Sequence, residues 1–248
     1  IPQRERPIVA TKCGRIMQED GTVKGCLKKE SVVRECEASL RRLQLDEIDI
    51  LLLAARHPQT IGIAVGEHIP AINRLIEQGK VRFVGSSEVT RSDNNHEWLR
   101  ALLPAGVVDV AMVGHNMLNQ SAQKTVFPTC LERDLGAMNI YTVRQVFNDG
   151  QRIRQVVAEL QERGVLADEV DAEDPFGWLL RDGDVSSTVE AAYRHAAYTP
   201  GVSTVVCGSI SADKIRQNIQ WVEKGPLAAE DLQRLQALFG GNDEVVGN

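Results

Sequence analysis

This sequence of 248 residues has few aromatic residues and no excess of positive charge. Phe, Trp and Tyr together make up 4% of the chain, too few for a platform on which nucleic-acid bases stack. The 34 acidic residues outnumber the 28 Lys and Arg, and the formal net charge of −6 disfavours nucleic acid and anionic membranes as partners. No apolar run approaches the ~20 residues of a membrane span, and no secretory signal is visible. We therefore expect a cytoplasmic protein with neither nucleic-acid nor membrane partners.

The cysteines lack the spacing of a metal site. Five are present, an odd number, with no Cys-x-x-Cys and no Cys/His pairing of metal-ligand spacing. Most of them stand beside apolar residues, so we expect reduced thiols in the core, a cytoplasmic location and no metal centre. The five are Cys13, Cys26, Cys36, Cys130 and Cys207.

Short apolar runs alternate with segments of helical periodicity along the whole chain. Six runs are rich in Val, Ile and Leu, as strands buried on both faces are. The alternation predicts a parallel sheet covered by helices, either doubly wound or closed as a barrel. Since no low-complexity linker interrupts it, residues 1–248 are expected to form a single domain. The predicted strands span 8–12, 48–55, 81–87, 107–113, 138–143 and 202–207, the predicted helices 31–43, 69–78, 93–103, 121–135, 151–163, 186–197, 212–218 and 228–239, and 15–29 is expected to be a loop.

The stretch 201–218 has the features of a phosphate-binding turn. Its apolar start predicts a buried strand, and Gly208 with Ser209 lets the backbone approach a ligand closely. Ser211 is a good N-cap, so free N–H groups and the positive end of a helix point out of the turn. Lys214, one turn into the helix, adds a charge for a further phosphate. An ordinary strand-to-helix turn would have the same local sequence.

Polar residues end several of the predicted strands, where parallel α/β proteins bind their ligands. Lys12 could stabilise an oxyanion or a phenolate if burial lowers its pKa, or it could extend to solvent. His57 could donate a proton or be an exposed loop residue. Tyr141 could stack on a flat ring or belong to the core. Arg144 needs a partner, either an acidic side chain or a ligand phosphate. The other polar residues at strand ends are Arg56, Ser86, Ser87, Glu88, His115 and Asn116.

Five stretches follow one another in the order and spacing of a known family. They are Ala10-Thr-Lys-Cys-Gly14, the segment 31–53 that ends Leu45-Asp-Glu-Ile-Asp-Ile-Leu-Leu-Leu53, Glu77-Gln-Gly-Lys-Val-Arg-Phe-Val-Gly85, His115-Asn-Met-Leu-Asn119, and 201–218. With these motifs the chain resembles the aldo-keto reductase superfamily over nearly its whole length. The resemblance implies a (β/α)8 TIM barrel that binds NADP(H) and moves a hydride to or from a carbonyl. Because only six units are visible, the first one or two β/α units of that barrel are expected to be missing from this chain.

The resemblance also implies roles for individual residues. Lys12 falls on the family's catalytic lysine, and Ser87 and Glu88 fall on the pair that holds the nicotinamide carboxamide. Tyr141 lies near the stacking aromatic, with Thr142 as the alternative. Lys214 sits where an arginine of the family often meets the 2′-phosphate, and its positive charge favours NADPH over NADH. The matches to the phosphate and adenine contacts are Gly208, Ser209, Ser211, Lys214, Gln217 and Asn218, and Asn116 and Arg144 are further candidate cofactor contacts.

Some positions depart from the family pattern. The family's catalytic aspartate and tyrosine are expected upstream of Lys12, and its histidine aligns with Ala54, so His57 replaces it only if the loop is shifted by three residues. Met112 stands where a glutamine commonly contacts the carboxamide.

Two functions therefore stay open. One is an NADPH-dependent oxidoreductase that interconverts a small-molecule carbonyl (an aldehyde, ketone or sugar) and an alcohol, with Lys12 and His57 catalytic. The other is a barrel that binds nucleotide as a sensor or partner protein without redox chemistry.

Overall fold

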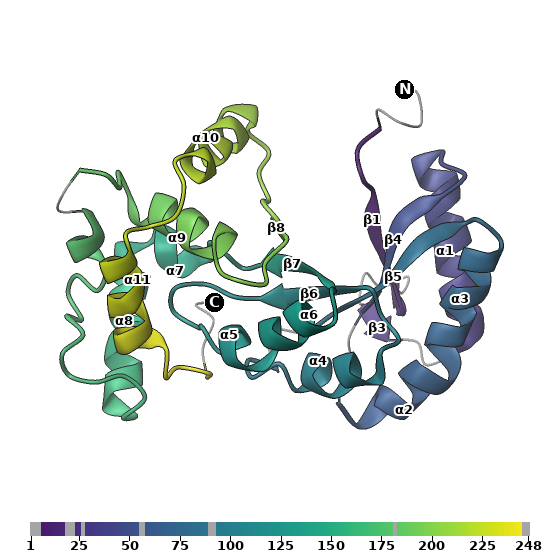
Figure 1. Cartoon of the computed structure of the whole chain (residues 1–248), viewed down its shortest axis with the longest axis horizontal. Helices are drawn as coiled ribbons and strands as arrows, with labels where there is room; N and C mark the ends of the chain where they lie inside the picture. The colour runs from purple at the N-terminus through teal and green to yellow at the C-terminus, as the bar shows by residue number, and fades with distance from the viewer. Residues whose placement is uncertain are drawn as a thin grey trace. The chain divides into compact units, whose positions relative to one another are not determined.

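The computed structural model describes residues 6–17, 23–25, 28–54, 58–88, 93–180 and 183–244, which form an α/β structure (Figure 1). The chain divides into two compact units, and the expectation of one domain over 1–248 stays a prediction. The first unit comprises Ile1–Asp93, Glu97–Met112 and Glu132–Gly136, and the second comprises Asn94–His96, Val113–Leu131 and Ala137–Asn248.

Within the described residues, six parallel strands form the larger sheet, one from each apolar run of the sequence. Their order is β1-β4-β5-β6-β7-β8, so strands that follow one another along the chain are neighbours in the sheet. This order is expected of repeated strand–helix units, because a parallel neighbour needs a crossover connection. The strands are β1 (Ala10–Cys13), β4 (Ile48–Ala54), β5 (Val81–Ser87), β6 (Val110–Gly114), β7 (Gly136–Ile140) and β8 (Thr204–Val205).

Strand β4 is the centre of the first unit. Its sequence, IDILLLA, is almost wholly apolar, and every residue except Ile50 is buried. It pairs in parallel with β1 on one side, where Lys12 lies opposite Leu52, and with β5 on the other, where Leu52 lies opposite Gly85. A Cβ at Gly85 would lie 2.6 Å from Cδ2 of Leu52, so this close packing requires glycine.

Two helices, α1 and α3, lie side by side against these strands (Figure 1). Helix α3 ends at the predicted glycine: Gly79 adopts a φ of +69°, and its N–H donates to the carbonyl of Ile76. A π-helical turn precedes it and continues the same helical stretch. The helices of the first unit are α1 (Lys29–Leu43), α2 (Ile61–Ile63), the π turn (Ala64–His68), α3 (Ile69–Glu77) and α4 (Glu97–Leu102), with 3-10 turns at Pro58–Thr60 and Leu103–Ala105.

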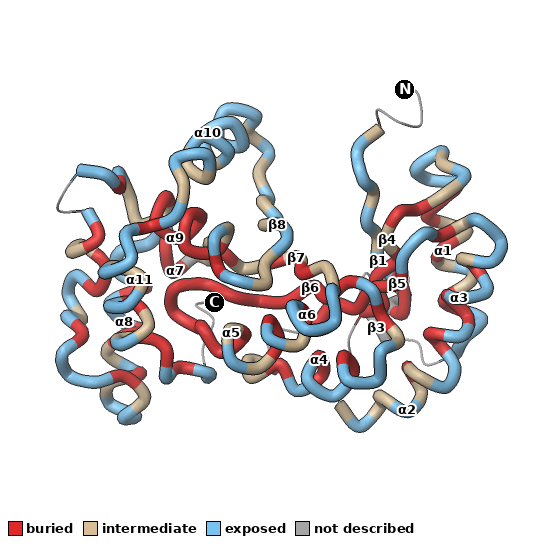
Figure 2. The backbone as a smooth tube through the Cα atoms, viewed as in Figure 1, coloured by how far each residue is buried: buried red, intermediate tan, exposed pale blue. Residues whose placement is uncertain are grey.

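The second unit has its own apolar core. Helices α8 and α11 contribute Val157, Leu160, Leu235 and Phe239 to it, and Leu118 joins them from the segment after β6. Residues 110–122 are buried without interruption, whereas α10 has no buried residue (Figure 2). The helices of this unit are α5 (Ala122–Thr125), α6 (Phe127–Glu132), α7 (Gln145–Asn148), α8 (Gly150–Glu162), α9 (Thr188–Ala197), α10 (Ala212–Glu223) and α11 (Ala229–Phe239), with a 3-10 turn at Gly177–Leu180.

The structure corrects several predicted elements. The predicted buried strand 202–207 is wrong, because only Thr204–Val205 pair with β7 and most of the run is exposed or half-buried. The predicted helix 121–135 is broken into α5 and α6 beside Pro128, which lacks an N–H. The first helix begins at Lys29 rather than Ser31, whose hydroxyl donates to the carbonyl of Lys28. The expected loop 15–29 includes two short antiparallel strands, β2 (Arg15–Met17) and β3 (Val23–Gly25).

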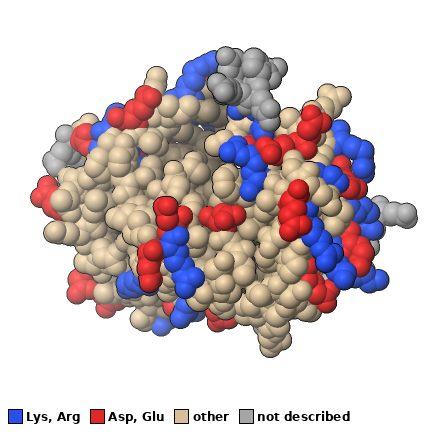
Figure 3. Space-filling model, turned by 45° about the vertical axis from the view of Figure 1, so that its right-hand side comes forward, with Lys and Arg blue, Asp and Glu red and all other residues tan. Residues whose placement is uncertain are grey.

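Charged residues of both signs are interspersed on the face shown in Figure 3. One carboxylate, Asp49 of β4, is buried among cations and bonds to Arg6, to Arg82 at 2.8 Å and to the N–H of Val9 at 2.9 Å. Burial alone would raise the pKa of Asp49, but these bonds outweigh it and lower that pKa to about 2.

Three of the cysteines are core thiols, as predicted. Cys13, Cys36 and Cys130 are buried and unpaired, Cys207 is half-buried, and Cys26 lies outside the described residues. Burial raises the pKa of both Cys36 and Cys130 to about 11. Within the described ranges no helix has the length and apolar character to cross a membrane, and no His, Cys, Asp and Glu side chains gather as a metal site.

Candidate functional site

In the first unit, the predicted catalytic lysine contacts a predicted cofactor residue. Lys12 lies in β1, and its Nζ donates a hydrogen bond of 2.9 Å to Oγ of Ser87, the last residue of β5. Ser87 and Glu88 are buried, whereas Lys12 is exposed, so of the two alternatives that the sequence left open for Lys12 the structure shows extension to solvent. The N–H of Glu88 donates to the carbonyl of Met112 on the neighbouring strand. The ammonium group is thus held at the carboxyl end of β5.

The second predicted catalytic residue, His57, lies outside the described residues, as does Arg56. Ala54, which occupies the position of the family histidine, is the last residue of β4 and is buried opposite Ser87. A methyl group cannot donate or accept a proton, so Ala54 supplies no acid–base chemistry at this strand end.

The second unit contains a pocket of about 690 Å³ that brings together six of the predicted cofactor residues. A pocket of this size accommodates a drug-sized ligand. Three of the six, Lys214, Gln217 and Asn218, lie on one face of α10, because residues three or four positions apart are neighbours on a helix surface. The predicted residues that line the pocket are Tyr141, Gly208, Ser209, Lys214, Gln217 and Asn218, together with the alternative Thr142.

The turn before α10 has the donors that a phosphate group needs. Ser211 is the N-cap, as predicted, and its Oγ accepts a bond of 3.4 Å from the N–H of Lys214. Ser209 supports the turn, because its Oγ accepts from the N–H of Ser211 at 3.1 Å. Nothing lies within 4 Å of a Cβ built on Gly208, so the backbone there borders open space. Lys214 is exposed, and no described carboxylate pairs with it. The helix N-terminus and this ammonium group together form an electropositive end of the pocket.

Tyr141, another residue of the pocket lining, is covered on one face by a cation. The guanidinium carbon of Arg144 lies 4.2 Å from the centroid of the Tyr141 ring. Arg144 therefore has a partner, as expected, but that partner is an aromatic ring and not a carboxylate. Tyr141 has a φ of +67°, an uncommon conformation for a residue with a side chain. One face of its ring is therefore already in use. Thr142 is buried and accepts a bond from Asn139.

Asn116, another predicted cofactor contact, is buried and uses its side chain within the fold. Its Nδ2 donates to the carbonyl of Tyr141 at 3.0 Å, and its Oδ1 accepts the N–H groups of Leu118 and Asn119 at 2.9 Å. It thus fixes the backbone of the residue that lines the pocket. His115 is likewise a core residue, whose ring stacks on that of His195 with centroids 5.1 Å apart.

Two aromatic residues that line the pocket, and a cysteine that contacts the lining, are not among the residues that the sequence assigned to the site. Tyr193 of α9 and Trp221 of α10 line the pocket, and Cys207 contacts both Tyr193 and Asn218. The signal for Trp221 was available in the sequence, because it follows Lys214 by seven residues and so lies on the same helix face. Nothing in the sequence places Tyr193 there, since α9 and α10 meet only through tertiary packing.

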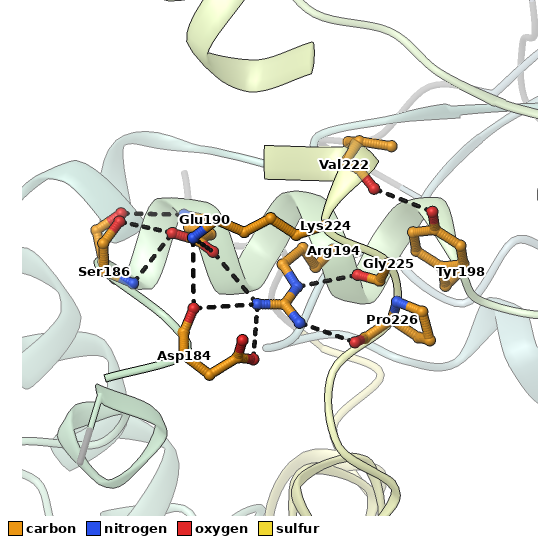
Figure 4. Close-up of polar contacts among 10 residues, drawn as sticks. Asp184, Ser186, Glu190, Arg194, Tyr198, Val222, Lys224, Gly225 and Pro226 are labelled. Carbon is orange, nitrogen blue, oxygen red and sulfur yellow. Dashed lines mark hydrogen bonds and ion pairs between the residues drawn. The ribbon is translucent and has the colours of Figure 1, made fainter. Parts of the chain in front are cut away.

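A buried ion-pair network fixes α9 to the segment that follows α10 (Figure 4). Glu190 is fully buried and accepts bonds from Lys224 at 2.8 Å and from Arg194 at 3.2 Å. Arg194 also donates to the carbonyls of Gly225 and Pro226, both at 2.9 Å. Burial favours a raised pKa at Glu190, but the bonds from Lys224 and from Ser186 outweigh it and lower that pKa. Because α9 and α10 both line the pocket, this network supports its walls.

Comparisons with known proteins agree with this fold. The model of the Aldo/keto reductase family matches residues 2–239. Among curated proteins, the chain is similar to an NADH-specific methylglyoxal reductase of Escherichia coli (strain K12), at 23% identity over 221 residues, which are 76% of this chain and 66% of the relative. It is also similar to an L-galactose dehydrogenase of Arabidopsis thaliana, at 32% identity over 133 residues, which are 53% of this chain and 40% of that relative. The matches thus span only two thirds or less of these relatives.

Solved structures show the same architecture. An aldo-keto reductase of Bacillus halodurans in its holo form superposes with a TM-score of 0.72 at 24% identity, over 97% of this chain and 76% of that one. A glycerol dehydrogenase of Gluconobacter oxydans superposes with a TM-score of 0.70 at 18% identity, again over 97% and 76% of the two chains. These likenesses confirm the predicted fold class, an α/β fold of the aldo-keto reductase type.

Proposed function

Because the chain belongs to the aldo/keto reductase family, we propose that it is an oxidoreductase that interconverts a carbonyl group of a small molecule and an alcohol. The redox partner is a nicotinamide dinucleotide, and we propose NADP(H). The observation that carries this proposal is the pocket of the second unit, where residues from the segment after β7, the β8–α10 turn and α10 line one cavity of about 690 Å³. When bound, the nicotinamide ring supplies or accepts the hydride.

The donors of the pocket fit a phosphorylated dinucleotide. Ser209, Ser211 and the first N–H groups of α10 suit an anionic group, because they combine hydrogen-bond donors with the positive end of a helix. Lys214 adds a full charge one turn along, where we propose that it meets the 2′-phosphate of NADP(H). The Escherichia coli relative is NADH-specific by its name, so the cofactor preference of this chain requires its own measurement.

In the first unit we propose that Lys12 is catalytic. Its ammonium group can stabilise negative charge that develops on the oxygen of the reacting carbonyl. Ser87 holds that group through the 2.9 Å bond, which restricts where the charge lies. We propose that Ser87 and Glu88 also contact the carboxamide of the nicotinamide, as the family resemblance implies. His57 remains a second catalytic candidate.

The test combines binding with turnover. NADPH fluorescence on titration measures binding, and oxidation of NADPH with a panel of aldehydes, ketones and sugars measures turnover. In Lys12→Met we expect binding to remain and turnover to fall at least 100-fold, since the charge that stabilises the oxyanion is lost. Lys80→Met is the matched control, because Lys80 pairs with Glu37 at 2.9 Å and touches neither site.

Two results would count against this proposal. Full turnover in Lys12→Met would remove Lys12 from the mechanism. Tight NADPH binding by the wild-type chain without turnover of any substrate in the panel would favour the alternative, a nucleotide-binding protein of this fold that senses the cofactor or serves as a partner protein.

A further inference from the structure

A second pocket of the second unit has a lining rich in glutamine. Its volume is about 470 Å³, and it shares no lining residue with the pocket proposed for the cofactor. It lies between the start of α5, the C-terminal end of α9 and α11. No charged residue of the described chain lines it. We call it the glutamine pocket, and its polar lining includes Gln120, Gln123, Gln233, Gln236, His195 and Thr199.

His195 is a buried polar residue of this lining. It is 3% exposed, and no described residue bonds to either nitrogen of its ring. The ring stacks on that of His115, with centroids 5.1 Å apart and 29° between the planes, so this contact restricts how it can turn. Burial lowers the pKa of His195 to about 4, so at pH 7 the ring is neutral and has one donor and one acceptor. Because a buried polar group without a partner is costly, the ring favours a ligand that both donates and accepts.

Gln120 offers the pocket a fixed acceptor. It is 1% exposed, and its Nε2 donates to the carbonyls of Met117 and Leu235, both at 3.0 Å. These bonds use both hydrogens of the amide, and no described residue donates to its Oε1. The polar atom that remains is a carbonyl oxygen, so a ligand at Gln120 must bring an O–H or N–H group.

The rest of the lining suits an uncharged ligand with several hydroxyl groups. The side-chain amides of Gln123, Gln233 and Gln236 bond to no described residue, so each can donate as well as accept. Leu232 and Ala237 add apolar surface for a carbon skeleton. An anion would be buried without a cation and an ammonium group without a carboxylate, which is unfavourable. A hydroxyl group donates and accepts at one atom and therefore matches each of these side chains. The volume far exceeds the ~30 Å³ of a single water molecule.

We propose that the glutamine pocket is a second ligand site, which binds an uncharged polyol through His195 and Gln120. The site goes beyond the proposed function, because it requires neither the nicotinamide dinucleotide nor Lys12. Hydroxyl groups of the polyol bond to the ring of His195 and donate to Oε1 of Gln120, and the glutamine amides bond to the remaining hydroxyls.

NMR spectra of the histidine ring nitrogens locate the site, with the full chain, sorbitol as the probe and no nucleotide present. The chain has five histidines, and the His195→Phe spectrum identifies the His195 signals. We expect sorbitol to shift these signals saturably, with a Kd on the order of 1–10 mM, while the signals of His68 in the first unit stay unchanged. An absence of any shift of the His195 signals up to about 200 mM sorbitol would overturn the inference.

Two further compounds test the chemistry of the ligand. Gluconate has the same six-carbon chain as sorbitol but ends in a carboxylate, and triethylene glycol dimethyl ether accepts hydrogen bonds without donating any. Each should bind at least about 10-fold more weakly than sorbitol, because the first buries an unpaired charge and the second leaves Oε1 of Gln120 without a donor. Equal binding of either compound would contradict a site for uncharged polyols.

Variants test the two kinds of contact, with the Kd for sorbitol measured by saturation-transfer difference. His195→Phe keeps a ring against His115 and removes both nitrogens, so the Kd should rise about 10-fold. Gln236→Leu removes one amide and should raise the Kd about 3-fold, and it keeps the test open if His195→Phe does not fold. Gln78→Leu is the matched control, since Gln78 is exposed in the first unit. An unchanged Kd in both pocket variants would overturn the inference. NADPH binding is measured separately, so its failure would refute the proposed function and leave the sorbitol result to decide this inference.

Discussion

Replacing Arg194 by methionine should destabilise the second unit strongly. Arg194 is only 3% exposed, and its guanidinium donates to the carboxylate of Glu190 and to the carbonyls of Gly225 and Pro226 (Figure 4). The methionine side chain has a similar length and no donor. The substitution therefore leaves two backbone carbonyls and one buried carboxylate with fewer partners.

The size of the effect follows from these losses. Breaking a buried ion pair by removing one partner costs about 3–5 kcal/mol. Because Lys224 still bonds to Glu190 at 2.8 Å, we expect the lower end of this range, about 3 kcal/mol. For a chain of this size that corresponds to a fall in Tm of roughly 6–12 °C.

Urea unfolding followed by circular dichroism measures this change in the free energy of unfolding. Arg216→Met is the matched control, since the pair between Arg216 and Asp213 is exposed and should contribute less than about 1 kcal/mol. A loss below about 1 kcal/mol in Arg194→Met would refute the reasoning.

The lowered pKa of Glu190 makes the stability depend on pH. The stabilising contribution of the Glu190 carboxylate is present above its unfolded pKa and is lost as the pH falls through its folded pKa. Glu190→Gln should therefore flatten the acid limb of the stability curve.

Three further outcomes are expected. Lys214→Ala should weaken NADPH about 5- to 10-fold more than NADH, as measured by the two dissociation constants, and equal effects would contradict a contact with the 2′-phosphate. Gly201→Ala should lower the free energy of unfolding in urea by about 3 kcal/mol, because Gly201 has a φ of +93° and the added Cβ would lie 2.7 Å from Cβ of Phe127. Unchanged stability would show that the turn can shift. Asp49, with a pKa lowered to about 2, should contribute about 2 kcal/mol above pH 4 that is lost as the pH falls toward 2, and a pH profile of Asp49→Asn with the same slope as the wild type would contradict this.

Much of the fold follows from local sequence patterns. The six apolar runs predict the six strands, and β5 has the predicted bounds because Gly79 and the polar residues after Ser87 delimit it. The cap at Ser211 is also predictable, since a serine before a helix bonds to an N–H within the next three residues. These features depend on neighbours in sequence.

Other features depend on which elements meet in space. The run 202–207 is as apolar as a buried strand, yet only Thr204 and Val205 pair with β7, and the run is exposed or half-buried at an edge of the described sheet. Asn116 ends a predicted strand, but its side chain bonds to the backbone around Tyr141 rather than lining the pocket. The bond between Tyr193 of α9 and Asn218 of α10, and that between Asn116 and the carbonyl of Tyr141, join separate elements. Periodicity within one element carries no information about them.

The central claim is that a nicotinamide dinucleotide binds in the pocket of the second unit, with a phosphate at the turn before α10. Amide hydrogen exchange over residues 207–218, measured with and without saturating NADPH, tests it most directly. We expect the N–H groups from Gly208 to Lys214 to become strongly protected, while those of α1 in the first unit keep their rates. NADPH binding with no change in exchange over residues 207–218 would contradict the account.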